Sequence, residues 1–68
     1  MTTLERRLVY VLVPKWLDHG IDAEEAEHRV YATLRSIGFE SEVARRRAYD
    51  IVCSALAHRD GFAGGGEP

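Results

Sequence analysis

The segment that decides the fold spans residues 4–17 and reads LERRLVYVLVPKWL. Wound as a helix, it carries apolar side chains over most of its circumference and leaves a narrow polar strip at Arg7, Pro14 and Asp18. A helix that is apolar on nearly all sides must be buried on nearly all sides. We therefore expect the rest of the chain, together with a second copy of it, to pack around this segment.

The chain of 68 residues is long enough for one domain. A domain this small usually needs a disulfide, a metal or a partner chain to be stable. Cys53 is the only cysteine, which excludes an internal disulfide. His19, His28 and His58 have no cysteine partner at the spacing of zinc ligands, so we expect no metal and no cofactor. Oligomerisation is the remaining means of stabilisation.

The charge balance is typical of an ordinary soluble domain, with 29% charged residues and a net charge of -2. Such a balance does not favour nucleic acid or an anionic membrane as a partner. The apolar run over residues 8–13 is too short for a signal peptide or a membrane span, so we expect a cytoplasmic protein. Lys15 is the only lysine among nine basic residues, a bias that points to a GC-rich bacterial or phage genome.

Three steps of glycine followed by an apolar residue predict the C-termini of three helices, at Gly20, Gly38 and Gly61. Glycine adopts the left-handed C′ conformation at no steric cost, and the next apolar residue folds back onto the last helical turn. Counting back along each helix gives the expected contacts: Ile21 with Trp16, Phe39 with Leu34, and Phe62 with Ala57.

The helix starts predicted from N-cap residues agree with these ends. Thr2 with Glu5 and Asp22 with Glu25 fit the capping-box pattern, and Ser41 is a favourable N-cap. We therefore predict an all-α, compact three-helix domain over residues 1–62, in which the first helix is central. The Gly-rich residues that follow it, 63–68, are expected to form a disordered tail. The three helices are predicted over residues 3–19, 22–37 and 41–60.

Pro14 creates a local conflict inside the first helix. It has no N–H to donate, and in an α-helix its ring crowds the carbonyl of Tyr10. The valine-rich residues 8–13 would also suit a strand, but no other segment offers a strand to pair with it. We expect a helix that is kinked or broken between residues 10 and 14.

The first helix has more apolar surface than two neighbouring helices can cover. We expect one stripe to face those helices and the opposite stripe, with Val9, Val13 and Leu17, to face water. Burying three such side chains is worth roughly 5–9 kcal/mol gross, an upper bound that is comparable to the roughly 3–5 kcal/mol net that a core of this size supplies. The inward stripe is expected to be Leu4, Leu8, Val11 and Leu12.

This surplus predicts a homodimer with two-fold symmetry, because one self-complementary surface closes such an assembly. The alternative is that a kink at Pro14 turns Trp16 and Leu17 into the core of the monomer, so that no apolar patch remains. A second protein partner, of unknown identity, would use the same kind of surface. The expected protein interface comprises Val9, Tyr10, Val13, Leu17, Tyr49, Val52 and Leu56.

The run Arg45-Arg46-Arg47 is the most conspicuous cluster of charge. With Gly38 as the turn glycine, this part of the chain resembles a helix-turn-helix motif, which implies phosphate contacts from these arginines. It departs from the motif at Leu34, where a small residue is expected, and at Arg47, where an apolar one is expected. Successive helical residues point about 100° apart, so the arginines do not form one patch. A small dimeric DNA-binding regulator is therefore the alternative function.

The remaining reactive residues predict no catalytic site. Cys53 has no histidine or basic residue three or four positions away, which favours an inert, half-buried thiol. Glu24 and His28 share one helical face, but two ligands do not make a metal site. We expect a small helical protein–protein interaction module that self-associates, an accessory or regulatory protein and not an enzyme.

Overall fold

The computed structural model describes residues 2–65, and the side chains of residues 2–59. Over this range the chain is helical and contains no strand, which confirms the predicted all-α fold and excludes the strand considered for residues 8–13. The first three elements follow one another without a break, so the chain forms three helical rods. The elements are α1 (Thr3–Arg7), the π-helix η1 (Leu8–Leu12), α2 (Val13–Asp18), α3 (Ala23–Ser36) and α4 (Ser41–Gly65).

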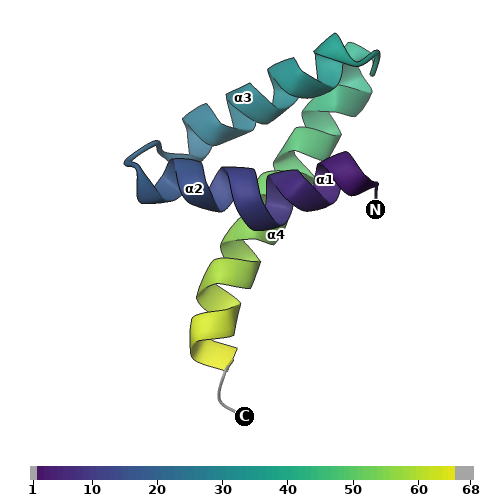
Figure 1. The fold of residues 1–68 in the computed structure, drawn as a ribbon. Coiled ribbons are helices and arrows are strands. Elements are labelled where there is room, and N and C mark those ends of the chain that lie inside the picture. The colour runs from purple at the N-terminus through teal and green to yellow at the C-terminus, as the bar shows by residue number, and fades with distance from the viewer. Residues whose placement is uncertain (1, 66–68) are drawn as a thin grey trace.

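The continuous rod made of α1, η1 and α2 lies beside α3, and α4 crosses both of them (Figure 1). The rod and α3 are joined by the turn at Gly20, and α3 and α4 by the turn at Gly38. The C-terminal turns of α4 extend past the rod (Figure 1). Within the described range, no helix combines the length and the apolar character that a membrane span requires.

The two inter-helical turns have the predicted cap geometry. Gly20 has φ +93° and Gly38 has φ +111°, in the region that favours glycine. Ile21 N–H donates to the Trp16 carbonyl at 3.0 Å, and Phe39 N–H donates to the Leu34 carbonyl at 3.1 Å. In each bond the donor lies five residues after the acceptor, which is the pattern of a Schellman motif. The helix ends expected at residues 20 and 38, with their fold-back residues, are confirmed.

The predicted helix end at Gly61 is wrong, because α4 continues to Gly65. At Gly20 and Gly38 the chain reverses and the next helix packs on the last, whereas Gly61 lies inside α4. A glycine inside a helix costs only about 1 kcal/mol relative to alanine and does not end it. Residues 63–65 of the expected tail therefore belong to α4, and residues 66–68 lie outside the described part of the chain.

The helix starts are capped largely as predicted. Thr2 Oγ1 accepts from Glu5 N–H at 3.2 Å, and Thr2 N–H donates to Glu5 Oε1 at 3.1 Å, which completes a capping box. Asp22 Oδ1 accepts from Glu25 N–H at 2.8 Å. The Glu25 carboxylate faces Arg29 at 3.5 Å, so at this helix only the Asp22 half of the predicted box is formed.

The conflict at Pro14 is resolved by the π-helical turn, not by a sharp kink or a break. Val13 N–H donates to the Leu8 carbonyl, five residues back. The π turn thus replaces the uniform α-helical geometry in which the Pro14 ring would crowd the Tyr10 carbonyl. Pro14 itself lies in the first turn of α2, where its missing N–H is not needed.

This π turn decides which side of the rod is buried. Residues five apart stack in a π turn, so Val13 follows Leu8 into the core and is fully buried, while Val11 is 52% exposed. The expected inward position of Val11 and outward positions of Val9 and Val13 are therefore wrong. The core comprises Leu8, Val9, Val13, Ala26, Val30, Leu34, Ala44, Ala48, Ile51, Val52 and Ala55.

Replacing Gly38 by alanine should lower the free energy of unfolding by about 1–2 kcal/mol, because an L-residue is disfavoured in the left-handed region. The added Cβ would meet no atom within 4 Å, so the loss would come from backbone conformation alone. Urea unfolding followed by circular dichroism measures the change. Glu40→Ala, at the exposed neighbouring position, is the control and should leave stability nearly unchanged. Wild-type stability in Gly38→Ala would contradict the cap assignment.

Replacing Val13 or Val11 by glutamate tests which of the two residues the π turn places in the core. Val13→Glu should unfold the chain or lower its Tm sharply, because an unpaired buried carboxylate costs several kcal/mol in a marginally stable domain. Val11→Glu should keep the wild-type helix content, since this side chain is half exposed. Far-ultraviolet circular dichroism against temperature compares the two. Equal thermal stability of the two variants would show that the π turn does not bury Val13 in preference to Val11.

Candidate protein-interaction surface

The structure does not assemble the interface predicted from the sequence. Three of its members are core residues, two are partly buried against the core, and two are exposed. The expectation that the aliphatic members face water is therefore wrong, because the rod and α4 pack their aliphatic side chains against each other. The core residues are Val9, Val13 and Val52, the partly buried ones are Leu17 and Leu56, and the exposed ones are Tyr10 and Tyr49.

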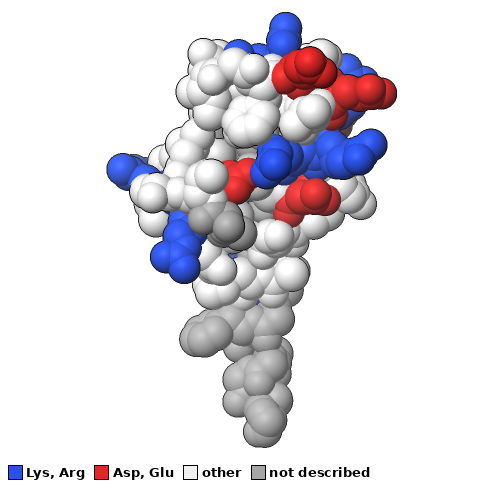
Figure 2. Space-filling view, turned by 90° about the vertical axis from the view of Figure 1, so that its right-hand side faces the viewer, with Lys and Arg blue, Asp and Glu red and all other residues white. Residues whose placement is uncertain are grey.

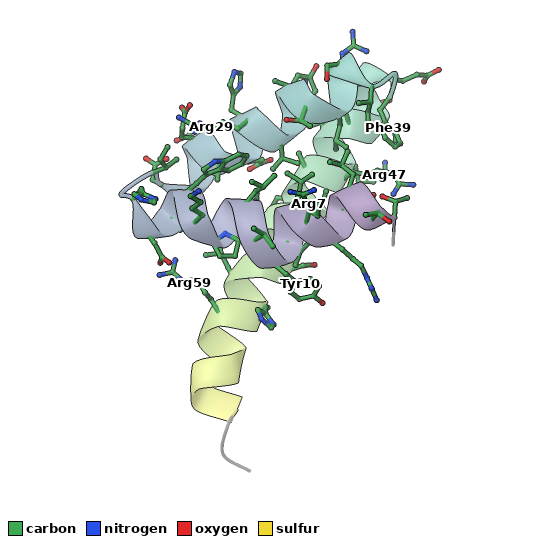
Figure 3. The ribbon with its side chains drawn as sticks, in the orientation of Figure 1. Arg7, Tyr10, Arg29, Phe39, Arg47 and Arg59 are labelled. Atoms are coloured by element: carbon green, nitrogen blue, oxygen red, sulfur yellow. The ribbon has the colours of Figure 1, made fainter. Side chains whose placement is uncertain are left out.

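The two exposed tyrosines belong to different surfaces. Tyr10 points from η1 toward α4 (Figure 3), and its ring meets the His58 ring edge-on, with 4.8 Å between centroids. Tyr49 precedes His58 by nine residues, which is two and a half helical turns. It therefore lies on the opposite side of α4, and the two tyrosines cannot form one contact patch.

Arg47 forms its contacts with other residues of the chain. Its guanidinium donates to Glu5 Oε2 at 2.7 Å and lies 5.3 Å from the centroid of the Phe39 ring (Figure 3). Glu5 is a buried charged residue, only 7% exposed. The hydrogen bond from the Thr2 backbone N–H and the pairing with Arg47 lower the pKa of Glu5, although burial opposes them. This ion pair ties the start of the rod to α4.

Arg45 is also engaged, on the other side of α4. Its guanidinium lies 5.9 Å from the centroid of the Tyr31 ring. The Tyr31 hydroxyl lies 3.0 Å from the Ser41 hydroxyl, which links α3 to the start of α4. The hydrogen bond with Ser41 and the charge of Arg45 lower the pKa of Tyr31. Ser41, predicted as an N-cap, is the first residue of α4 and bonds this phenol through its side chain.

The predicted nucleic-acid residues are thus divided among three directions. On the face that Figure 2 shows, a short row of basic side chains is bordered above and below by acidic ones. Leu34, which departs from the helix-turn-helix pattern, is fully buried in the core. Arg46 remains, and it forms no ion pair with any described side chain.

Two shallow depressions flank Arg46 on the outside of α4. Their volumes are about 440 Å³ and 400 Å³, and both are lined by Glu42 and Arg46. Val43 lines the first and is 40% exposed; Tyr49 lines the second and is 59% exposed. We call this surface the α4 outer face and define it by Glu42, Val43, Arg46, Tyr49 and Asp50.

The α4 outer face carries both signs of charge beside apolar side chains. Arg46 and Asp50 are one helical turn apart, and neither forms an ion pair within the described part of the chain. The core of a protein interface is enriched in aromatic residues and arginine. Tyr49 beside Arg46 matches that composition.

The other reactive residues lie apart from one another. Cys53 is exposed, not half-buried as expected, and its hydrogen bond with the Tyr49 hydroxyl raises the pKa of that phenol. Glu24 and His28 line one shallow depression with neighbouring acidic residues. Among the described residues, no three His, Cys, Asp or Glu side chains are grouped to hold a metal ion. The expected absence of catalysis and cofactor stays a prediction.

Of this surface, sequence reasoning identified Tyr49 as a protein-contact residue and Arg46 only as a nucleic-acid contact in the alternative function. The signal that could have found the rest is the spacing of Val43, Arg46, Asp50 and Cys53, which repeats every three or four residues opposite the buried alanines. Comparison with protein-family models, curated proteins and solved structures found no match. The functional argument therefore depends on the geometry of the α4 outer face.

The pairing of Glu5 predicts how stability depends on pH. A carboxyl whose pKa is lowered by folding stabilises the fold above its unfolded pKa, and this stability is lost as the pH falls through the folded value. We expect the Tm of the wild type to fall between about pH 5 and pH 3, the range in which a glutamate of ordinary pKa begins to protonate. The Tm of Glu5→Gln should fall less steeply over that pH range.

Thermal melts at a series of pH values measure this effect. Glu40→Gln is the matched control, because Glu40 is exposed, lies outside the α4 outer face and forms no ion pair with a described side chain. It should reproduce the wild-type pH profile. A Glu5→Gln profile parallel to the wild type would contradict a stabilising role for the Glu5–Arg47 pair.

Proposed function

We propose that the chain is a small helical protein–protein interaction module that self-associates through the α4 outer face. Its place in the cell would be that of an accessory or regulatory protein, and its arginine-rich composition favours a bacterial or phage origin. The observation that carries the proposal is the exposure of Val43 and Tyr49 on either side of Arg46. The contact surface thus differs from the one expected on the first helix.

A stable interface needs a large contact area, and α4 is the helix long enough to provide it. Such an interface buries about 800 Å² on each partner, contributed by roughly 20–30 residues. The total accessible surface of this chain is 4675 Å², so a contact of that size needs an extended element. α4 is 25 residues long, against 14 in α3, and its backbone extends past the rod. Contacts can therefore spread along it from the α4 outer face.

The alternative of a small dimeric DNA-binding regulator draws less support from the charges. Arg47 is paired with Glu5, and Arg45 lies over Tyr31, so each contributes less to a phosphate contact. Phosphate binding requires several cations that act together on one backbone. Arg46 alone, beside Glu42 and Asp50, does not provide such a group.

Sedimentation velocity or light scattering over a range of micromolar concentrations tests self-association. We expect a species with twice the mass of one chain. Tyr49→Ala and Val43→Ser should each weaken the dimer by roughly tenfold, since about 1.4 kcal/mol of lost contact corresponds to that factor. The matched controls are Tyr10→Ala and Val11→Ser, which remove the same kinds of exposed side chain from η1 and should leave the dimer intact.

Other outcomes would overturn the proposal. A monomer at all concentrations would exclude self-association, and weakening by the η1 variants alone would place the contact on the rod. Duplex DNA labelled for fluorescence anisotropy tests the alternative at low salt. Binding that weakens steeply with salt and is lost when Arg45, Arg46 and Arg47 become alanine would favour the DNA-binding function instead.

A further inference from the structure

We infer that two copies of the chain pair their α4 helices antiparallel across a two-fold axis, with Arg46 of each copy against Asp50 of the other. The inference rests on the proposed self-association and names its partner surface and register. The partner is a second copy of this chain. The charge pattern of the α4 outer face is the observation that selects it.

The positions of the two charges define the register. Arg46 and Asp50 lie equally far, two residues each, from the level of Ala48 on α4. A two-fold axis that lies between the two helices, perpendicular to both at that level, relates each arginine to the aspartate of the partner subunit. One self-complementary contact thus forms two ion pairs. An axis at the level of residue 46 or 50 would instead place like charges opposite each other, which is unfavourable.

The space around α4 permits this approach. The buried side of the helix carries Ala44, Ala48, Ile51 and Ala55, and Arg46 lies nearly opposite them at about 100° per residue. The rod lies on the side of Arg47, and α3 lies on the side of Arg45. The α4 outer face is therefore the side of this helix that neither neighbour covers.

The same symmetry brings the two Tyr49 side chains together. A two-fold axis perpendicular to α4 keeps Tyr49 on the same edge of both helices, one residue from the level of the axis. The two residues are then about 3 Å apart along the helix direction, since each residue rises 1.5 Å. Their rings can contact each other at the edge of the interface, and aromatic pairs stabilise such contacts. Val43 lies at the level of Cys53 of the partner subunit.

Charge reversal tests the pairing, and the dissociation constant from sedimentation is the measurement. Arg46→Asp and Asp50→Arg should each raise the dissociation constant at least tenfold, because each places like charges in contact. The double variant should return to within about threefold of the wild type, since the swapped pairs form again across the axis. Circular dichroism of each variant confirms folding, which is expected because both positions are exposed.

The matched control uses the exposed pair Glu25 and Arg29 on α3, which has the same spacing and pairs within its own helix at 3.5 Å. Reversing either charge there, or both, should leave the dissociation constant unchanged. Failure of the α4 double variant to recover, while Tyr49→Ala still weakens the dimer, would overturn the register but keep self-association. Absence of any dimer in the wild type would instead overturn the proposed function.

A disulfide provides a second, independent test of the register. In the antiparallel arrangement the two Cys53 residues are about 15 Å apart along the helix direction, so oxidised wild type should remain without an intermolecular bond. Val43→Cys should form a covalent dimer on oxidation, with residue 43 joined to Cys53 of the partner subunit. Mass spectrometry of the linked peptides identifies the bond. A link between the two residues 43, or between the two Cys53 residues, would contradict the proposed axis.

Discussion

The constraint on which the rest of the structure depends is the proline in the middle of the first helix. Pro14 has no N–H for the helical ladder, and an α-helical turn would place its ring against the Tyr10 carbonyl. The chain widens the preceding turn into the π-helix η1, in which Val13 N–H bonds the Leu8 carbonyl. The rod therefore stays continuous, but the side chains on its two halves are rotated relative to a uniform α-helix. Val9 and Val13 enter the core by this rotation.

Most apolar side chains of the rod are buried against the other helices, although Tyr10 and Val11 remain exposed on η1. Glu5 and Arg47 fasten the start of the rod to α4, and Tyr31 with Arg45 fastens α3 to the same helix. α4 is thus held on two sides by its neighbours. Its third side carries half-exposed apolar side chains and charges that form no ion pair with a described side chain. These groups would therefore be available to a partner.

The three consecutive arginines illustrate how helical geometry divides a charge cluster. At about 100° per residue, Arg45 turns toward α3, Arg47 toward the rod, and Arg46 toward solvent. A run that looks like one basic site in the sequence becomes two structural contacts and one surface charge. The role of each arginine depends on its neighbours, and Arg46 lies beside the acidic Glu42 and Asp50.

The sequence by itself determined the local features: the capping box at Thr2, the left-handed turns at Gly20 and Gly38, and the helical class of the fold. Each depends on residues within one or two helical turns, so it can be predicted without tertiary contacts. Only the tertiary structure decided which side of residues 4–17 is buried, because both stripes are equally apolar and the π turn chooses between them. The same holds for Gly61, since a glycine inside a helix costs only about 1 kcal/mol and does not by itself end the helix. Of the α4 outer face, Tyr49 was predictable as a contact residue, whereas the roles of Arg46 and Asp50 follow from which helices cover α4.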